Sequence, residues 1–224
     1  MTDDVRDRRT VLVFATTLIC LWGARFGQDL RDDSWSRLVR ICFWSGTQIV
    51  FYLVVPLIVV VAAGWSPRDF GWRLRGTSAD WKKYAALFLV AVPFVVAASF
   101  SHDFQDRYPL YEVVRGQTGV ARDLAIWWTF YAVQFIAVEA FFRGFLVLGL
   151  APRLGRTAVV VATIPYLMIH FVKPPAEAAA AIVGGLVMGT LALRTRSIWW
   201  GVALHVSVAA FMDVMSLGHK GFVW

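Results

Sequence analysis

The sequence has few of the charged residues that a soluble protein needs. Charged residues make up only 17% of its 224 residues, whereas 58% are hydrophobic, 15% are aromatic and eleven are Trp. Soluble globular domains carry about 25% charged residues, and the mean hydropathy here is +0.61. This composition excludes an ordinary soluble domain and predicts an integral membrane protein in contact with lipid.

Cysteine is also scarce. The chain has two cysteines, Cys20 and Cys42, and both lie in or beside apolar runs, where cysteine usually behaves as a small buried hydrophobe. They indicate neither a disulfide framework nor a cysteine metal cluster. The sequence also lacks the His-Glu-x-x-His pattern of many zinc proteases.

No long polar segment, internal repeat or low-complexity tract interrupts the chain. The net charge is +7 and the pI is near 9.8, but the Lys and Arg residues are spread over every loop, so we do not expect nucleic acid as a partner. We expect one continuous membrane domain, in which residues 1–80 form N-terminal helices and connecting loops and residues 81–224 form the core. The loop Ser101–Asp123 is expected to act as a lid or rim.

The apolar runs predict an all-α fold, a polytopic transmembrane helical bundle of about seven spans (six to eight). A crossing needs about 20 apolar residues. The first run is short and could lie at the interface instead, and we expect it to be retained as an anchor because no clear cleavage site follows. The expected spans are Val11–Gly23, Ile41–Gly64, Trp81–Phe100, Leu124–Leu150, Thr157–Phe171, Ala176–Leu193 and Ile198–Leu217.

The basic residues predict an orientation. With seven crossings, twelve of the 22 Lys and Arg residues lie on the N-terminal side of the membrane and nine on the other, and Arg143 lies within a span. Loops that carry more Lys and Arg tend to stay in the cytoplasm. The N-terminus is therefore expected to be cytoplasmic.

Two charged residues fall inside the fourth run. Glu139 and Arg143 are four residues apart, so a helix places them on one face, one turn apart. An isolated charge in lipid costs at least about 2.5–3.5 kcal/mol, and pairing lowers that cost. The pair is either a structural ion pair or part of a functional site, and these two residues alone favour neither reading.

Two histidines in later runs favour a functional site. With a rise of about 1.5 Å per residue, and measured from the side where the fourth span ends, Glu139 lies about 15 Å deep, His170 about 20 Å and His205 about 10 Å. The three residues therefore meet in the middle of the bilayer as one buried polar site. Asp213 lies two turns beyond His205, and it either hydrogen-bonds within the site or sits near the far interface.

These residues resemble the motifs of the CPBP intramembrane proteases, also called the Abi or CaaX-protease family, which includes the Ras-converting CaaX endoprotease. Family members carry Glu-Glu-x-x-x-Arg, Phe-x-x-x-His and His-x-x-x-Asn or Asp, each on a transmembrane helix. The matching segments here are Val138-Glu139 to Arg143, Tyr166 to His170, and His205 to Ala209. The resemblance covers about Leu124 to Leu217, and it departs from the family at Val138, Tyr166 and Ala209.

The resemblance implies an intramembrane endopeptidase whose catalytic core lies in the four C-terminal spans. Glu139 and His170 would activate water, and His205, alone or with Asp213, would polarise the scissile carbonyl, with Arg143 in support. The implied substrate is a membrane-associated peptide or protein, prenylated or otherwise tagged, and the implied location is a bacterial plasma membrane. Because Val138 and Ala209 depart from the motifs, a catalytically silent relative that binds or scaffolds membrane partners is the alternative, and a small transporter is a third.

The resemblance implies a glutamate mechanism that needs no cofactor. Zinc remains a rival, because Glu139, His170 and His205 would make a set of two histidines and one carboxylate with an open coordination position.

Overall fold

A computed structural model of the protein describes residues 3–74, 77, 80–114 and 117–222. The described residues form helices and their connections, without a strand among them, which confirms the all-α fold. The helices are α1 (Asp3–Phe26), α2 (Arg37–Ile49), α3 (Val55–Ala62), α4 (Trp81–Ser99), α5 (His102–Arg107), α6 (Val120–Glu139), α7 (Gly149–Leu154), α8 (Thr157–Met168), α9 (Pro175–Thr195) and α10 (Trp199–His219).

Two of these helices continue directly into a neighbour. A π-helical segment, Val50–Val54, joins α2 to α3, and a second, Ala140–Leu148, joins α6 to α7. Each join makes one long rod, so Arg37–Ala62 and Val120–Leu154 each form a continuous helical stretch.

Six helical stretches are long and apolar enough to cross a membrane, which agrees with a polytopic transmembrane bundle of six to eight spans. They are Asp7–Leu30, Arg37–Ala62, Trp81–Ser99, Val120–Leu154, Pro175–Thr195 and Trp199–His219. The first begins earlier than the expected Val11 because α1 starts at Asp3, so this run is long enough to cross as well as apolar enough.

The expected fifth span, Thr157–Phe171, differs most from the prediction. Its helix α8 has twelve residues and ends at Met168, which gives about 18 Å of rise against a hydrocarbon core of about 30 Å. Turns follow as far as Lys173, and α9 begins at Pro175. The apolar pattern continues past Met168, but the helix does not, because Pro174 and Pro175 favour an extended backbone and then the start of a new helix.

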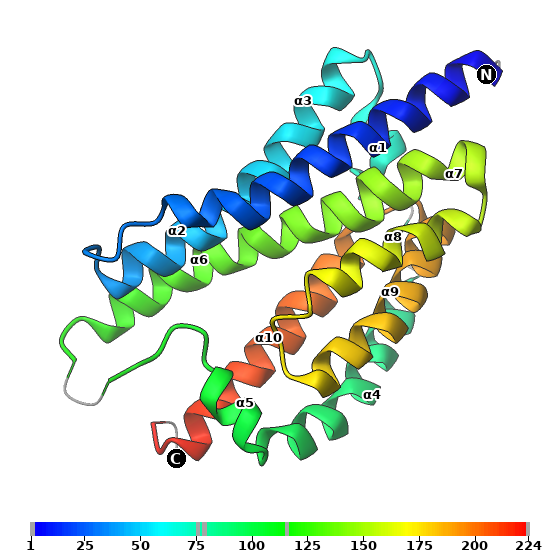
Figure 1. Ribbon diagram of the computed structural model, residues 1–224. Helices are drawn as coiled ribbons and strands as arrows, with labels where there is room; N and C mark the ends of the chain where they lie inside the picture. Colours follow the sequence, from blue (N-terminus) through cyan, green and yellow to red (C-terminus); the bar gives the residue numbers. More distant parts are fainter. Residues whose placement is uncertain (1–2, 75–76, 78–79, 115–116, 223–224) are drawn as a thin grey trace.

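The rod Val120–Leu154 forms the centre of the bundle. In Figure 1 it runs between α1 and α2 on one side and α8, α9 and α10 on the other, and the helix contacts agree: α2 and α10 pack against α6, α1 packs against α7, and α8 and α9 pack against the π-helical segment. All nine residues of that segment are buried. This enclosure explains how the rod holds charged side chains away from lipid.

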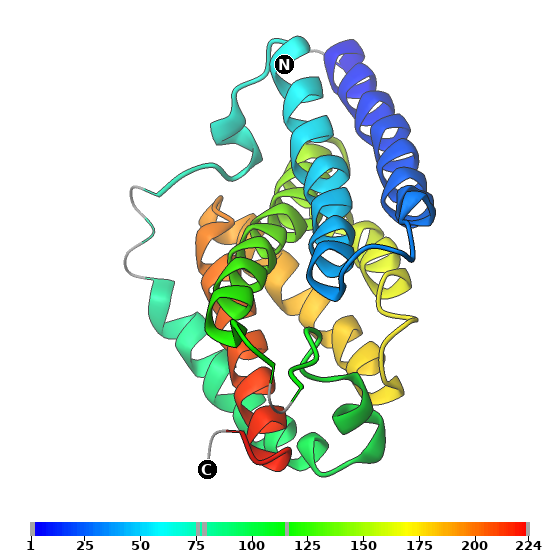
Figure 2. The same ribbon diagram turned by 90° about the vertical axis from the view of Figure 1, so that its left-hand side faces the viewer.

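The helices α8 and α9 form an antiparallel pair beside the rod (Figures 1 and 2). Two glycines on α9 let the backbones approach closely. A Cβ at Gly185 would lie 2.7 Å from Thr163 Cγ2, and one at Gly189 would lie 2.9 Å from Val159 Cγ1. Small residues of this kind are common where transmembrane helices touch, and here they hold α8 against α9 within one chain.

The expected lid, Ser101–Asp123, is tied to the ends of two helices, although residues 115 and 116 lie outside the described part. Tyr108 donates a hydrogen bond of 2.6 Å to Glu177 Oε2 on α9 and accepts one of 2.8 Å from Lys173 Nζ. Lys220 Nζ, after α10, donates to the Tyr108 carbonyl at 2.7 Å. Burial raises the pKa of the Tyr108 phenol and lowers the pKa of the Lys173 ammonium, so Tyr108 stays protonated and keeps donating.

Candidate active site

The carboxylate of Glu139 lies at the end of α6, directly before the π-helical segment, and is fully buried. Arg143 lies one turn further on within that segment, and its Nη1 is 3.2 Å from Glu139 Oε1. π-Helical turns inside an α-helix are frequent at functional sites. The ion pair predicted from the sequence is therefore present, and it lies in the centre of the bundle.

His205 reaches this pair from α10. Its Nδ1 is 2.8 Å from Glu139 Oε1. The approach depends on Gly201, one turn earlier on α10, because a Cβ at that position would collide with Glu139 Oε2. A small residue on α10 thus places a histidine against a carboxylate that is 66 residues away in the chain.

Tyr166 on α8 completes the contact network, and sequence reasoning did not identify it as a site residue. Its hydroxyl lies 3.0 Å from His205 Nε2, and the Arg143 guanidinium carbon lies 4.1 Å from the centre of its ring. The sequence did carry a signal, since Tyr replaces the Phe of the family motif. A phenol in an apolar helix needs a hydrogen-bond partner, and His205 is that partner here.

The donor and acceptor roles follow from the carboxylate. An ionised carboxylate can only accept protons from its neighbours, so His205 Nδ1, 2.8 Å from Glu139 Oε1, is the ring nitrogen that carries the proton. In a neutral ring, Nε2 then accepts from the Tyr166 hydroxyl, and in a protonated ring Nε2 donates to it. Glu139 therefore fixes the tautomer of His205.

His170 lies just past the end of α8 and joins the site through Tyr166. Its Nδ1 is 2.7 Å from the Tyr166 carbonyl oxygen, and its ring centre is 4.6 Å from that of Tyr166. A carbonyl oxygen only accepts, so Nδ1 carries the proton and Nε2 has a free lone pair in the neutral ring. The structure thus brings Glu139, Arg143 and His205 into direct contact and links His170 to them through one intervening residue.

The remaining motif positions lie outside this network. Asp213 is buried, but its Oδ1 has no hydrogen-bond partner, and it lies about 12 Å along α10 from His205. Its electrostatic neighbours include Lys173 and Tyr131, which places it toward the loop Ser101–Asp123. Val138 and Ala209, where the family has polar residues, are buried in hydrophobic clusters.

The donor set does not fit a zinc ion. Within the described part of the chain, no three His, Cys, Asp or Glu side chains form a group that could hold a metal. His205 Nδ1 and Glu139 Oε1 are 2.8 Å apart, which is closer than two ligands that each lie about 2.0–2.2 Å from one tetrahedral zinc ion would be. We therefore derive no step through a metal.

Taken together, these contacts define a polytopic membrane protein with a Glu–Arg–His–Tyr network inside its helical bundle. Residues 120–211 match the family model described as Rce1-like, type II CAAX prenyl endopeptidase Rce1-like, a stretch that begins with α6 and ends within α10. This stretch carries the three motifs, so the match agrees with their resemblance to the CPBP, or CaaX-protease, family. No curated protein and no solved structure matches the chain.

Proposed function

We propose that the protein is an intramembrane endopeptidase that hydrolyses peptide bonds of membrane-associated substrates, prenylated or otherwise tagged. The observation that carries the proposal is the convergence of Glu139, His205 and Tyr166 from three helices inside the bundle, with contacts of 2.8 and 3.0 Å. Such groups are costly in a membrane and mark functional sites there. The family supports the peptidase class.

Glu139 acts in this proposal through His205. The carboxylate is fully buried, whereas the His205 side chain is 19% exposed, so the histidine is the group that substrate can reach. Arg143 keeps Glu139 ionised, and Glu139 in turn holds His205 by its Nδ1. With a protonated ring, His205 Nε2 donates to the Tyr166 oxygen, and the Tyr166 hydroxyl then donates to the scissile carbonyl and stabilises the oxyanion.

His170 supplies the base. Its free Nε2 takes a proton from water, and the hydroxide oxygen forms a bond to the carbonyl carbon while the carbonyl electron pair moves to the oxygen. When the tetrahedral species collapses, the carbon–nitrogen bond breaks and the leaving nitrogen takes the proton back from His170. His170 returns to its neutral form, because the proton that it took from water leaves with the amine.

Cleavage of tagged membrane peptides by purified protein tests this function. We expect Glu139→Ala, His170→Ala and His205→Ala each to lower turnover at least about 100-fold. The matched control is His102→Ala, because His102 lies on α5, 89% exposed, and pairs only with Asp106. Wild-type turnover in both the Glu139 and His170 variants would show that the site is assigned wrongly.

A catalytically silent relative is the second candidate, and two observations favour it. Val138 packs in the core where the family has its first glutamate, and Glu139 itself has no exposed surface. This function predicts that purified protein retains membrane peptides without cleaving them. The same assay separates the candidates, since binding without product in the wild-type protein supports only the second.

We further propose a bacterial plasma membrane location with the N-terminus in the cytoplasm. The start of α1, the end of α7 and the turn between α9 and α10 lie toward one end of the bundle (Figure 1), and these segments carry Arg8, Arg9, Arg153, Arg156 and Arg196. Basic loops favour the cytoplasmic side. Labelling of a cysteine introduced at Asp4 by a membrane-impermeant reagent in intact cells would contradict this orientation.

A further inference from the structure

One buried cation lies outside the candidate active site. Arg9, on the second turn of α1, has only 7% of its surface exposed. Its guanidinium lies over two aromatic rings, 4.4 Å from the centre of Phe70 and 5.4 Å from that of Trp65. Those two rings stack on each other at 5.8 Å, so Arg9 is fixed against an aromatic platform.

The aromatic rings pack against the face of the guanidinium, but they offer no hydrogen-bond acceptor to the N–H groups along its edge. Nε and Nη2 of Arg9 are buried and have no hydrogen-bond partner, and among the described residues no carboxylate lies within 4.0 Å of them. Asp7, the nearest acid on α1, pairs instead with Arg153 at 3.1 Å. A buried guanidinium without an anionic partner is costly, because stacking does not replace the N–H hydrogen bonds that water would provide.

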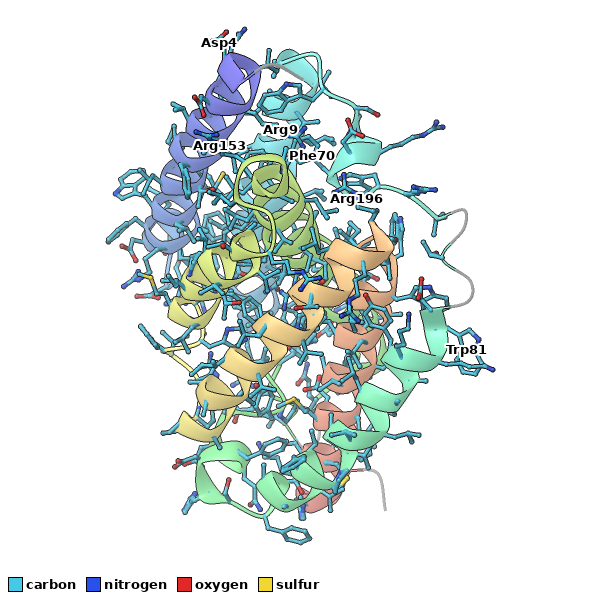
Figure 3. The ribbon with its side chains drawn as sticks, turned by 90° about the vertical axis from the view of Figure 1, so that its right-hand side faces the viewer. Asp4, Arg9, Phe70, Trp81, Arg153 and Arg196 are labelled. Carbon is cyan, nitrogen blue, oxygen red and sulfur yellow. The ribbon has the colours of Figure 1, made fainter. Side chains whose placement is uncertain are left out.

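A second cation lies in electrostatic range. Arg196, at the end of α9, interacts with Arg9, as does Asp69. Its Nη2 approaches the Asp69 carbonyl oxygen at 3.5 Å, so both arginines contact the segment Pro67–Phe70. Figure 3 shows Arg9, Phe70, Arg153 and Arg196 toward the same end of the molecule.

We infer that Arg9 and Arg196 form a binding site for a phosphate ester, and specifically for the headgroup of an anionic phospholipid. Two guanidinium groups held near each other repel, and an anion between them removes the repulsion and supplies the missing acceptors. Arg9 lies two residues after the start of the candidate span Asp7–Leu30, which puts it at headgroup depth. Trp65 beside it is the type of residue that marks this depth.

The test is the thermal unfolding midpoint of the full chain in detergent, with added dioleoylphosphatidylglycerol or the zwitterionic dioleoylphosphatidylcholine. We expect the anionic lipid to raise the midpoint more, because a ligand that binds only the folded state stabilises it. Arg9→Gln and Arg196→Asn should each lose at least about half of that difference. Asn suits position 196 because its φ is +56°, a left-handed conformation that Asn tolerates well.

Arg8→Gln is the matched control. Arg8 precedes Arg9 on the same helix, is exposed, and its replacement changes the net charge by the same amount, so the lipid effect should persist in full. Equal losses in all three variants would reveal diffuse attraction to a basic surface and overturn the site, as would equal midpoints in the two lipids. If Arg9→Gln does not fold, the comparison of Arg196→Asn with Arg8→Gln decides the question.

A final measurement distinguishes a phospholipid headgroup from a soluble phosphate ester as the ligand. Soluble glycerol phosphate carries the same chemistry without acyl chains, and we expect it to leave the midpoint unchanged at millimolar concentration. A midpoint rise equal to that given by the anionic lipid would overturn the lipid assignment. The inference does not depend on peptidase activity.

Discussion

At the residue scale, the Tyr166 hydroxyl gives the candidate site a donor that the family motif lacks. The motif has Phe at this position and Asn or Asp at the position of Ala209, which here is buried among Tyr111, Trp127 and Tyr131. The hydroxyl lies 3.0 Å from His205 Nε2, close to where a polarised carbonyl oxygen would have to lie. Compared with the family motif, this chain thus lacks a polar group at position 209 and has an additional one at position 166.

Replacing this hydroxyl is the first prediction. Tyr166→Phe should lower kcat about 100-fold with little change in KM, because the lost donor acts on the developing oxyanion. The measurement is steady-state cleavage of a membrane peptide by purified protein. Tyr52→Phe is the control, since Tyr52 is also buried but packs on Phe141 and Phe142 rather than on His205. Unchanged kcat in Tyr166→Phe would limit the hydroxyl to a packing role.

Metal removal is the second prediction at this scale. Exhaustive chelation should leave cleavage unchanged, because Glu139 Oε1 and His205 Nδ1 lie 2.8 Å apart, too close for both to bind one tetrahedral zinc ion. Turnover and elemental analysis of the same metal-free sample check this together. Loss of activity that returns on adding zinc would establish a metal mechanism.

At the scale of helices, contacts between small residues decide which side chains meet. Gly201 lets α10 approach α6 at Glu139, and Gly185 lets α9 approach α8 at Thr163. The second contact positions α8, which carries Tyr166. The geometry of the site therefore depends on the close packing of α8, α9 and α10 around the central rod. One added methyl group at such a glycine would push the helices apart.

Gly201→Ala tests this dependence. The added Cβ would collide with Glu139 Oε2, so we expect a loss of about 1–3 kcal/mol of stability together with loss of activity. Gly184→Ala is the control, since a Cβ there has nothing within 4 Å, and a better helix former should be neutral or stabilising by up to about 1 kcal/mol. The measurement is chemical unfolding in detergent micelles. Equal stability of the two variants would contradict the predicted collision.

At the scale of the whole molecule, the loop Ser101–Asp123 closes one end of the bundle. The start of α1 and the turn between α9 and α10 lie at the opposite end (Figure 1). Tyr108 connects the loop to α9 through Glu177 and to the chain after α10 through Lys220. Asp213 lies buried toward this end, near Lys173. A substrate that enters from this end would have to pass the hydrogen bonds of Tyr108.

Tyr108→Phe should loosen this closure. The change removes the hydrogen bond to Glu177 and leaves Lys173 with one acceptor fewer, at a cost of about 1–2 kcal/mol. We expect faster amide hydrogen exchange in residues 102–112 and unchanged exchange in α1. Tyr84→Phe, a buried tyrosine on α4, is the control, and exchange that is equal in the two variants would show that Tyr108 does not hold the loop.

The sequence by itself determined the membrane class, most of the helices and the polar residues of the site, because hydropathy is a local property that a run of about 20 residues displays. It did not determine the helix ends, since turn residues such as Pro174 stop a helix while the apolar pattern continues. Only the tertiary structure decided that His205 contacts Glu139, that Tyr166 contacts His205, and that Arg9 stacks on Phe70. These are contacts between side chains on different helices, and helical periodicity fixes which face of a helix a residue occupies but not which neighbour that face meets.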